Sequence, residues 1–210
     1  MNIHLFTVNP FQQNTYLLHH NGKAILFDAG FSNNSEHQQL KIYLDTNELD
    51  LEAVYLTHAH IDHVIGLQQV VNDYDVPVYL HDDDRRFIDG FEQHAAMFGV
   101  KVEPITTEIQ SLESGDMTWQ EIHIEKRFTP GHAPGHISFY IPEMDCVVAG
   151  DTLFQMSIGR TDLPGGDFEI LSRSIRNELY QLPGKTTVYP GHGPTTTIGQ
   201  EKKNNPFVKV

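Results

Sequence analysis

The chain has 210 residues, a formal net charge of -14 and a single cysteine. This length suffices for one sizeable core, and no linker-like tract interrupts the sequence, so we expect one globular domain over residues 1–210. The negative charge disfavours a nucleic-acid partner, because it repels phosphate backbones. No apolar run approaches the roughly 20 residues that span a bilayer, so no membrane partner is expected. The N-terminal stretch lacks the pattern of a secretion signal, which makes the cytoplasm the expected location.

The first half of the chain predicts strands followed by strand-helix units. Three strand-like runs, "IHLFTV", "TYLLHH" and "KAILFDAG", come first, with an Asn21-Gly22 turn before the third. Residues 35–47 have apolar side chains at helical spacing, and residues 51–56 form the next strand-like run. A helical pattern runs from Asp62 to Tyr74, the strand "VPVYLH" follows, and residues 82–99 are expected to form a helical connection.

The second half repeats this order of elements. The runs "TWQEIHIEKRFT", "HISFYIP" and "DCVVAGD" predict three strands. Apolar positions from Phe168 to Leu179 predict an amphipathic helix with Asp167 as its N-cap, and "TTVYPGHG" predicts a strand that enters a glycine-rich turn. Two similar halves of this kind predict an α/β (α+β) fold, a four-layer αβ/βα sandwich with two sheets inside and helices outside.

The segment "THAHIDH", residues 57–63, follows a predicted strand and carries four candidate metal ligands. In extended backbone, residues two apart point the same way, so His58 and His60 can present two imidazoles to one ion. Asp62 and His63 come where the chain turns into a helix, so a second ion nearby is geometrically natural. The alternative is that Asp62 only caps the helix and that the histidines are exposed turn residues.

Three further candidates lie at strand-to-turn transitions, in "TPGHAPGH", "AGDTLF" and "YPGHGP". These candidates are His132, Asp151 and His192, and each has a glycine nearby that lets the backbone turn closely. Each one alone has an ordinary alternative as a turn or cap residue. Together with the first motif they indicate ligands that converge from different strands onto one sheet edge.

The seven candidates can be divided between two ions. One ion takes His58, His60 and His132, the other takes Asp62, His63 and His192, and Asp151 bridges both. Nitrogen and carboxylate ligands without thiolate suit zinc, iron or manganese, and two close ions suit hydrolysis. The ligand types do not choose among these metals, and two divalent ions, with zinc as the first choice, are expected. Cys146 is expected to be a small buried core residue without a chemical role.

These motifs resemble the metallo-β-lactamase-fold superfamily, whose His-x-His-x-Asp-His hallmark matches residues 58–63. The contexts "TPGHAPGHISFY" and "GDTLFQMSIGRTDLPGGD" look most like the glyoxalase II (hydroxyacylglutathione hydrolase) branch, in its short bacterial form without a C-terminal helical domain. The resemblance implies a thioesterase that acts on S-lactoylglutathione or a related hydroxyacyl thioester, a small-molecule substrate. It also implies that Asp62 and Asp151 orient a metal-bridging hydroxide as the catalytic carboxylates.

Two more residues have open assignments. Arg160, in "SIGRTD", falls where the resemblance implies a cation for the glycine carboxylate of glutathione, and the alternative is a structural pair with Asp162 or Asp167. His136, four residues after His132, could support the site or be an unrelated strand residue, and we expect the second.

The same residues leave other functions open. A persulfide dioxygenase would use one iron on His58, His132 and Asp151, but its branch usually has a cysteine where this chain has Ile158. A lactonase or phosphodiesterase would use the same two ions. A binding module without catalysis is the alternative from another class, and the complete ligand set argues against it.

Overall fold

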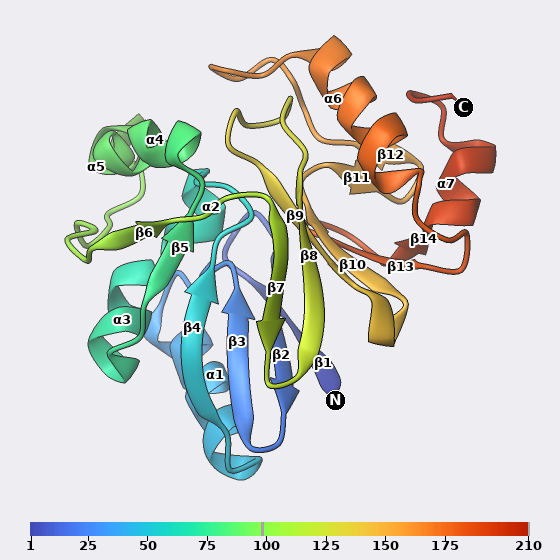
Figure 1. The fold of residues 1–210 in the computed structure, drawn as a ribbon. Coiled ribbons are helices and arrows are strands. Elements are labelled where there is room, and N and C mark those ends of the chain that lie inside the picture. Colours follow the sequence, from blue (N-terminus) through green and yellow to red (C-terminus); the bar gives the residue numbers. More distant parts are fainter. Residues whose placement is uncertain (98, 210) are drawn as a thin grey trace. The chain divides into compact units, whose positions relative to one another are not determined.

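A computed structural model describes residues 1–97 and 99–209 of the chain. The chain divides into two compact units, Met1–Leu112 and Glu113–Val210. Each unit is built on one six-stranded sheet together with helices (Figure 1). The predicted α/β class is therefore confirmed, whereas the single domain over residues 1–210 stays a prediction.

The first unit has strands in the order β1-β2-β3-β4-β5-β6. The pairs β1-β2 and β2-β3 are antiparallel, and all later neighbours are parallel. Its strands are β1 (Asn2–Val8), β2 (Gln13–His20), β3 (Lys23–Phe27), β4 (Asp50–Tyr55), β5 (Val78–Leu80) and β6 (Ile109–Ser111). The predicted meander and strand-helix units are thus confirmed, while the short β6 has no counterpart in the prediction.

The helices of the first unit connect its parallel strands. They are α1 (Asn34–Thr46), α2 (Ile61–Val64), α3 (Leu67–Tyr74), the 3-10 turn η1 (Asp82–Asp84), α4 (Arg85–Asp89) and α5 (Phe91–Met97). Crossovers between parallel strands are almost always right-handed, which puts α1 and the α2-α3 connection on the same face of the sheet.

The helix predicted from Asp62 to Tyr74 is interrupted between α2 and α3. At Gly66 the backbone passes so close to Phe31 that a Cβ atom would lie 2.3 Å from the Phe31 carbonyl oxygen. The contact therefore requires glycine, and the prediction of one continuous helix is wrong because tertiary packing breaks it here.

The second unit has strands in the order β14-β13-β10-β9-β8-β7. Strands β7 to β10 form an antiparallel meander, and β10 pairs in parallel with β13. These strands are β7 (Gly115–Trp119), β8 (Ile122–Phe128), β9 (Ile137–Ile141), β10 (Cys146–Gly150), β13 (Thr187–Pro190) and β14 (Thr196–Thr197). A small hairpin of β11 (Leu153–Phe154) and β12 (Ser157–Ile158) follows β10.

The single strand predicted over "TWQEIHIEKRFT" is instead a hairpin of β7 and β8. Gln120 and Glu121 form its turn with φ of 46° and 67°. Tight hairpin turns need positive φ and usually have Asn or Gly there, so this pair of long side chains provides no turn signal. The prediction failed because strand pairing, and not local preference, imposes the turn.

The helices of the second unit cover an apolar core. They are α6 (Phe168–Ser174), the π-helical segment η3 (Ile175–Leu179) and α7 (Ile198–Asn204), with the 3-10 turn η2 (Pro142–Met144) before β10. Asp167 caps α6 as predicted, because its side chain accepts a hydrogen bond of 2.9 Å from the Ile170 amide. Leu171, Ile175 and Leu179 are fully buried in this core as predicted, whereas Phe168, the first residue of the predicted apolar face, is 42% exposed.

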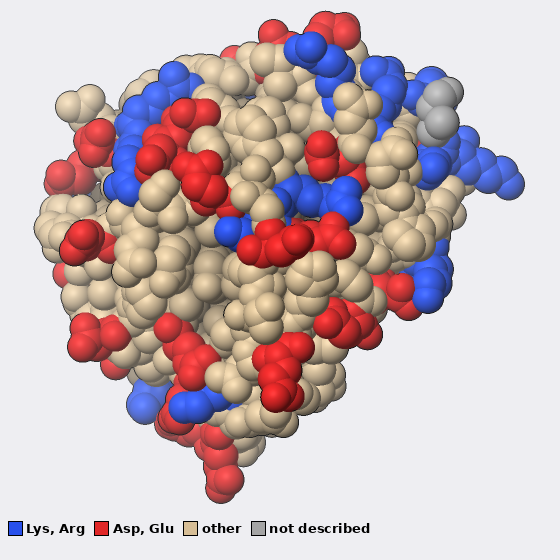
Figure 2. Space-filling view, in the orientation of Figure 1, with Lys and Arg blue, Asp and Glu red and all other residues tan. Residues whose placement is uncertain are grey.

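No helix within residues 1–97 and 99–209 is long and apolar enough to cross a membrane. Acidic and basic side chains are interspersed over the face drawn in Figure 2. The surplus of acidic residues thus forms no uninterrupted acidic block on that face.

Gly131 lies in the turn between β8 and β9 and approaches α6 closely. Its φ is 123°, and a Cβ atom would lie 2.2 Å from the Leu171 amide nitrogen. Gly115 has nearly the same φ, 121°, but a Cβ atom there would meet nothing within 4 Å. An alanine at position 115 would therefore introduce backbone strain alone, whereas an alanine at position 131 would introduce strain and steric overlap.

We expect Gly131→Ala to destabilise the protein more than Gly115→Ala. Both changes introduce backbone strain of about 1–3 kcal/mol, and only Gly131→Ala adds overlap with α6, at about 1–3 kcal/mol more. Urea unfolding of both variants and the wild type measures the difference. Equal losses of unfolding free energy would show that the close contact with Leu171 does not exist in solution.

Candidate metal centre

In the first unit the functional side chains follow the ends of neighbouring parallel strands. Asp28 comes directly after β3, and its amide donates to the Tyr55 carbonyl of β4 at 3.0 Å. The segment from Thr57 to His63 begins two residues after β4. Parallel strands end at the same sheet edge, so their pairing brings Asp28 beside this segment.

The Asp28 carboxylate holds both ends of the "THAHIDH" segment. It accepts hydrogen bonds from the Thr57 amide at 2.8 Å and from the Thr57 hydroxyl at 2.9 Å. It also accepts from His63 Nδ1 at 2.8 Å. Asp28 is 2% exposed and has a left-handed backbone, φ 64°, which these contacts hold in place. Sequence reasoning missed this residue, although an aspartate between a strand and a glycine was a signal for it.

Asp84 fixes the middle of the same segment. Its carboxylate accepts a hydrogen bond of 3.1 Å from the Ala59 amide, and the residue is fully buried. It reaches this position from η1, just beyond β5, the strand parallel to β4. Asp84 was also missed, because the predicted connection over residues 82–99 offered no reason to choose one of its three consecutive aspartates.

Hydrogen bonds to Nδ1 determine how the rings of His58 and His63 are protonated. Since Asp28 accepts from His63 Nδ1, that atom carries the proton and Nε2 has the lone pair. Thr57 gives its hydroxyl proton to Asp28, so it accepts from His58 Nδ1 at 3.0 Å, and His58 Nε2 also keeps its lone pair. Both rings are thereby set as metal ligands through Nε2.

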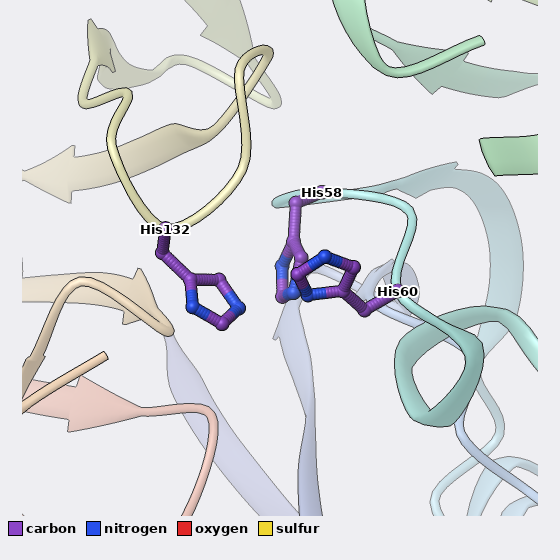
Figure 3. Close-up of side chains that lie close together, drawn as sticks. All are labelled: His58, His60 and His132. Atoms are coloured by element: carbon purple, nitrogen blue, oxygen red, sulfur yellow. The ribbon is translucent and has the colours of Figure 1, made fainter. Parts of the chain in front are cut away.

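The four candidate ligands of the first unit lie close together. His58 and His60 offer ring nitrogens within 4.8 Å of each other, as do His58 and His63. The rings of His58 and His60 meet edge to face, with centroids 4.7 Å apart (Figure 3). Asp62 Oδ2 lies 3.7 Å from His63 Nε2. The predicted clustering of these residues is therefore present, and Asp62 lies inside α2, whose N-cap is His60.

In the second unit three candidate ligands meet beyond the ends of β8, β10 and β13. The Gly191 amide donates to the Gly150 carbonyl at 2.8 Å, which aligns the ends of the two parallel strands. Asp151 and His192 follow directly. Asp151 Oδ2 lies 3.5 Å from His132 Nε2 and 3.6 Å from His192 Nε2. Asp151 is thus the common neighbour of two imidazoles, as a bridging ligand would be.

The main chain of Arg160 orients His132. His132 Nδ1 donates to the Arg160 carbonyl oxygen at 2.8 Å, so His132 Nε2 has the lone pair and faces Asp151. Figure 3 labels His132 and shows its side chain on a turn of the chain. No sequence pattern indicated this role, because any residue can supply a carbonyl.

The side chain of Arg160 lies elsewhere, in an exposed ion pair. Its guanidinium donates twice to the Asp162 carboxylate, at 2.8 and 2.7 Å, and is 61% exposed. The hydrogen bonds from Arg160 lower the pKa of Asp162 to about 2. The structural pairing considered from the sequence is therefore present, with Asp162 as the partner, while substrate binding by Arg160 stays a prediction.

His136 is part of the Asp151 neighbourhood, and the expectation of an unrelated strand residue is wrong. The residue is fully buried, and its Nε2 accepts a hydrogen bond of 3.1 Å from the Asp151 amide. The two residues are distant in sequence but meet because His136 directly precedes β9 and Asp151 directly follows β10, the strand that pairs with β9.

The donor atoms of each unit suit a divalent transition metal. Three imidazoles, those of His58, His63 and His132, have Nδ1 engaged and Nε2 set as the ligand atom. Carboxylates stand beside imidazoles in both units, and nitrogen with carboxylate suits zinc, iron or manganese. The residues therefore fit a metal, whereas the division of the seven ligands between two ions stays a prediction.

The family described as the metallo-beta-lactamase superfamily matches residues 8–192. The chain is 38% identical over 203 residues to the probable metallo-hydrolase YqgX of Bacillus subtilis, covering 96% of this chain and 94% of that protein. It is 35% identical over 212 residues to the hydroxyacylglutathione hydrolase GloC of Haemophilus influenzae, covering 99% and 98%.

Solved structures agree with these matches. BLEG-1, a B3 metallo-beta-lactamase, has a TM-score of 0.90 and 34% identity and covers both chains completely. TTHA1623, solved in a di-iron-bound form, has a TM-score of 0.87 and 38% identity and covers 98% of this chain and all of the other. The predicted metallo-β-lactamase fold is confirmed, and with a family match over most of its length the chain belongs to the metallo-beta-lactamase superfamily.

Proposed function

We propose that the protein is a dinuclear metal-dependent thioesterase of the glyoxalase II type, acting on S-lactoylglutathione or a related hydroxyacyl thioester. The observation that carries the proposal is the set of imidazoles whose Nδ1 atoms are engaged by Thr57, Asp28 and the Arg160 carbonyl. This arrangement prepares nitrogen ligands in both units. The relative GloC, named a hydroxyacylglutathione hydrolase, supports the choice of substrate.

In the proposed site, His58, His60 and His132 would hold one ion, Asp62, His63 and His192 would hold a second, and Asp151 would be a ligand shared by both. Two divalent ions would supply an activated water and would polarise the thioester carbonyl. Asp62 and Asp151 would orient the attacking water by accepting its hydrogen bonds. Zinc is the first metal to test, and the di-iron form of TTHA1623 makes iron the second.

The cysteine of the chain does not offer a competing nucleophile. Cys146 is 1% exposed within β10, and burial raises the pKa of its thiol to about 12. A thiol in this state is almost wholly protonated at neutral pH and is inert. The residue therefore acts as the small core side chain expected from the sequence, and water is the nucleophile in the proposed reaction.

The proposed substrate carries carboxylates, and Arg160 is the group proposed to bind one. Its guanidinium already makes the two-pronged contact with Asp162 that a substrate carboxylate would make. Because the pair is exposed, exchange of Asp162 for a substrate carboxylate costs little. We also propose a cytoplasmic protein with a small-molecule substrate and without nucleic-acid or membrane partners, as the composition predicts.

A second candidate is β-lactam hydrolysis, because BLEG-1 is similar over its whole length. The same ligands would serve both reactions, so the substrate and not the metal separates them. The persulfide dioxygenase considered from the sequence differs in consuming oxygen.

We expect the protein loaded with two equivalents of zinc to hydrolyse S-lactoylglutathione faster than a β-lactam. Metal-free protein is loaded with zinc or iron, and thioester loss, β-lactam opening and oxygen uptake with glutathione persulfide are measured in parallel. No thioester loss with either metal would refute the thioesterase. Oxygen uptake by the iron form would instead favour the dioxygenase.

His60→Ala should lose metal and thioesterase activity together. Even residues that only orient metal ligands contribute about 10- to 100-fold, so loss of a ligand should reduce kcat/KM by more than about 100-fold. His123→Ala is the matched control, since this histidine is 43% exposed and pairs with Asp116 on the surface. Metal content and kcat/KM measure the effect, and full activity without metal loss in His60→Ala would remove His60 from the ligand set.

Arg160→Ala should raise KM for S-lactoylglutathione by about tenfold with little change in kcat. The variant keeps the carbonyl that orients His132, so it tests the side chain alone. A tenfold change corresponds to about 1.4 kcal/mol, a magnitude suited to one charged hydrogen-bonded contact. Asp162→Ala is the control, and it should lower KM or leave it unchanged because it releases the guanidinium. An unchanged KM in Arg160→Ala would remove its side chain from the substrate site.

A further inference from the structure

His136 directly precedes β9, and Asp151 directly follows β10, the strand that pairs with β9 in the second unit. Antiparallel pairing of β9 with β10 ends at Val148↔Phe139, and the same register continued by three residues sets Asp151 opposite His136. On the other side, the Thr129 amide donates to the His136 carbonyl at 2.9 Å. Three neighbouring chain segments therefore meet at the level of the His136 side chain.

The hydrogen bonds of the His136 ring have only one consistent direction. A backbone amide can only donate, so Nε2 accepts from the Asp151 amide and must have its lone pair. The neutral ring then carries its proton on Nδ1, which donates to Thr129 Oγ1 at 2.9 Å. Thr129 Oγ1 is also hydrogen-bonded to Ser138 Oγ at 2.9 Å. The imidazole is thus a neutral bridge from the Asp151 backbone to the interior of the sheet.

Asp151 is held on its carbonyl side as well. A Cβ atom on Gly159 would lie 1.9 Å from the Asp151 carbonyl oxygen, so the β12 end packs directly against it. The strand register shifts between Val148 and Gly150, and the backbone of Gly150 is left-handed, φ 48°. Regular sheet pairing thus does not extend to Asp151, and the His136 imidazole takes the place of a strand partner for its amide.

We propose that His136 is a positioning residue, which fixes the backbone of Asp151 and so aims its carboxylate between His132 and His192. The proposal rests on the proposed function, because the direction of the Asp151 carboxylate matters only if Asp151 is the ligand shared by both metal ions. His136 itself is not a ligand, since the Nε2 lone pair that would bind metal is used by the Asp151 amide. A residue that only fills the core would need no acceptor at this atom.

Three substitutions at this position test the proposal. The side-chain amide introduced by His136→Gln has an acceptor and a donor about as far apart as the two ring nitrogens, so it can serve both Asp151 and Thr129. His136→Asn can reach the Thr129 side only, and His136→Leu can reach neither. Thr196→Val is the control, because it removes a different buried hydrogen bond of this unit, from Thr196 to Glu201 at 2.6 Å.

We expect His136→Leu and His136→Asn to weaken metal binding by about 10- to 100-fold and to lower kcat with less effect on KM. His136→Gln should recover most of both, and Thr196→Val should lose stability without losing metal affinity. Metal affinity is measured by chelator competition, the ligand field by the visible spectrum of the cobalt form, and stability by urea unfolding of the metal-free protein. If His136→Leu does not fold, the comparison of His136→Asn with His136→Gln carries the test.

A metal-free measurement separates this inference from the proposed function. An N–H···N hydrogen bond transmits a scalar coupling between the Asp151 amide nitrogen and His136 Nε2, which nuclear magnetic resonance detects in the wild type without metal or substrate. Absence of this coupling would overturn the inference, as would equal metal loss in Thr196→Val and His136→Leu at equal stability. Wild-type protein that shows the coupling and binds metal but does not hydrolyse the thioester would overturn the proposed function alone.

Discussion

Parallel pairing of neighbouring strands is the constraint on which the candidate site depends in both units. In the first unit it aligns the ends of β3, β4 and β5, and in the second the ends of β10 and β13. Because parallel strands end at the same sheet edge, residues that follow different strands become neighbours in space although they are far apart along the chain. The chain thus needs little local structure to collect its ligands, and most of them lie in turns.

Those turns are held by polar groups that do not bind metal in the proposed site. In the first unit, buried Asp28 and Asp84 accept from the backbone and side chains of the ligand segment. In the second, a carbonyl of Arg160 and the ring of His136 hold His132 and Asp151 in a comparable way. Turns alone would let the imidazoles rotate, so these contacts supply the orientation that metal binding requires.

The sequence predicted the ligand set better than the supporting groups, for a physical reason. Metal ligands need particular side-chain types near glycines at strand ends, and this pattern is visible locally in "THAHIDH" and "TPGHAPGH". The groups that orient these ligands can be a backbone carbonyl, a single aspartate among several, or a histidine at the end of a neighbouring strand. Asp84 was therefore missed, His136 was considered but assigned the wrong role, and Arg160 was noticed for its side chain although its carbonyl holds His132.

The sequence by itself determined the class of the fold, the order of most elements, the cap at Asp167 and the superfamily. These features depend on short-range patterns such as periodicity, capping and motif spacing. The tertiary structure alone decided the break at Gly66, the hairpin turn at Gln120 and Glu121, and the partner of His136. The break at Gly66 and the partner of His136 depend on which distant backbone lies alongside, and the hairpin turn depends on the pairing of β7 with β8, so strand pairing and close packing set these features only once the chain has folded.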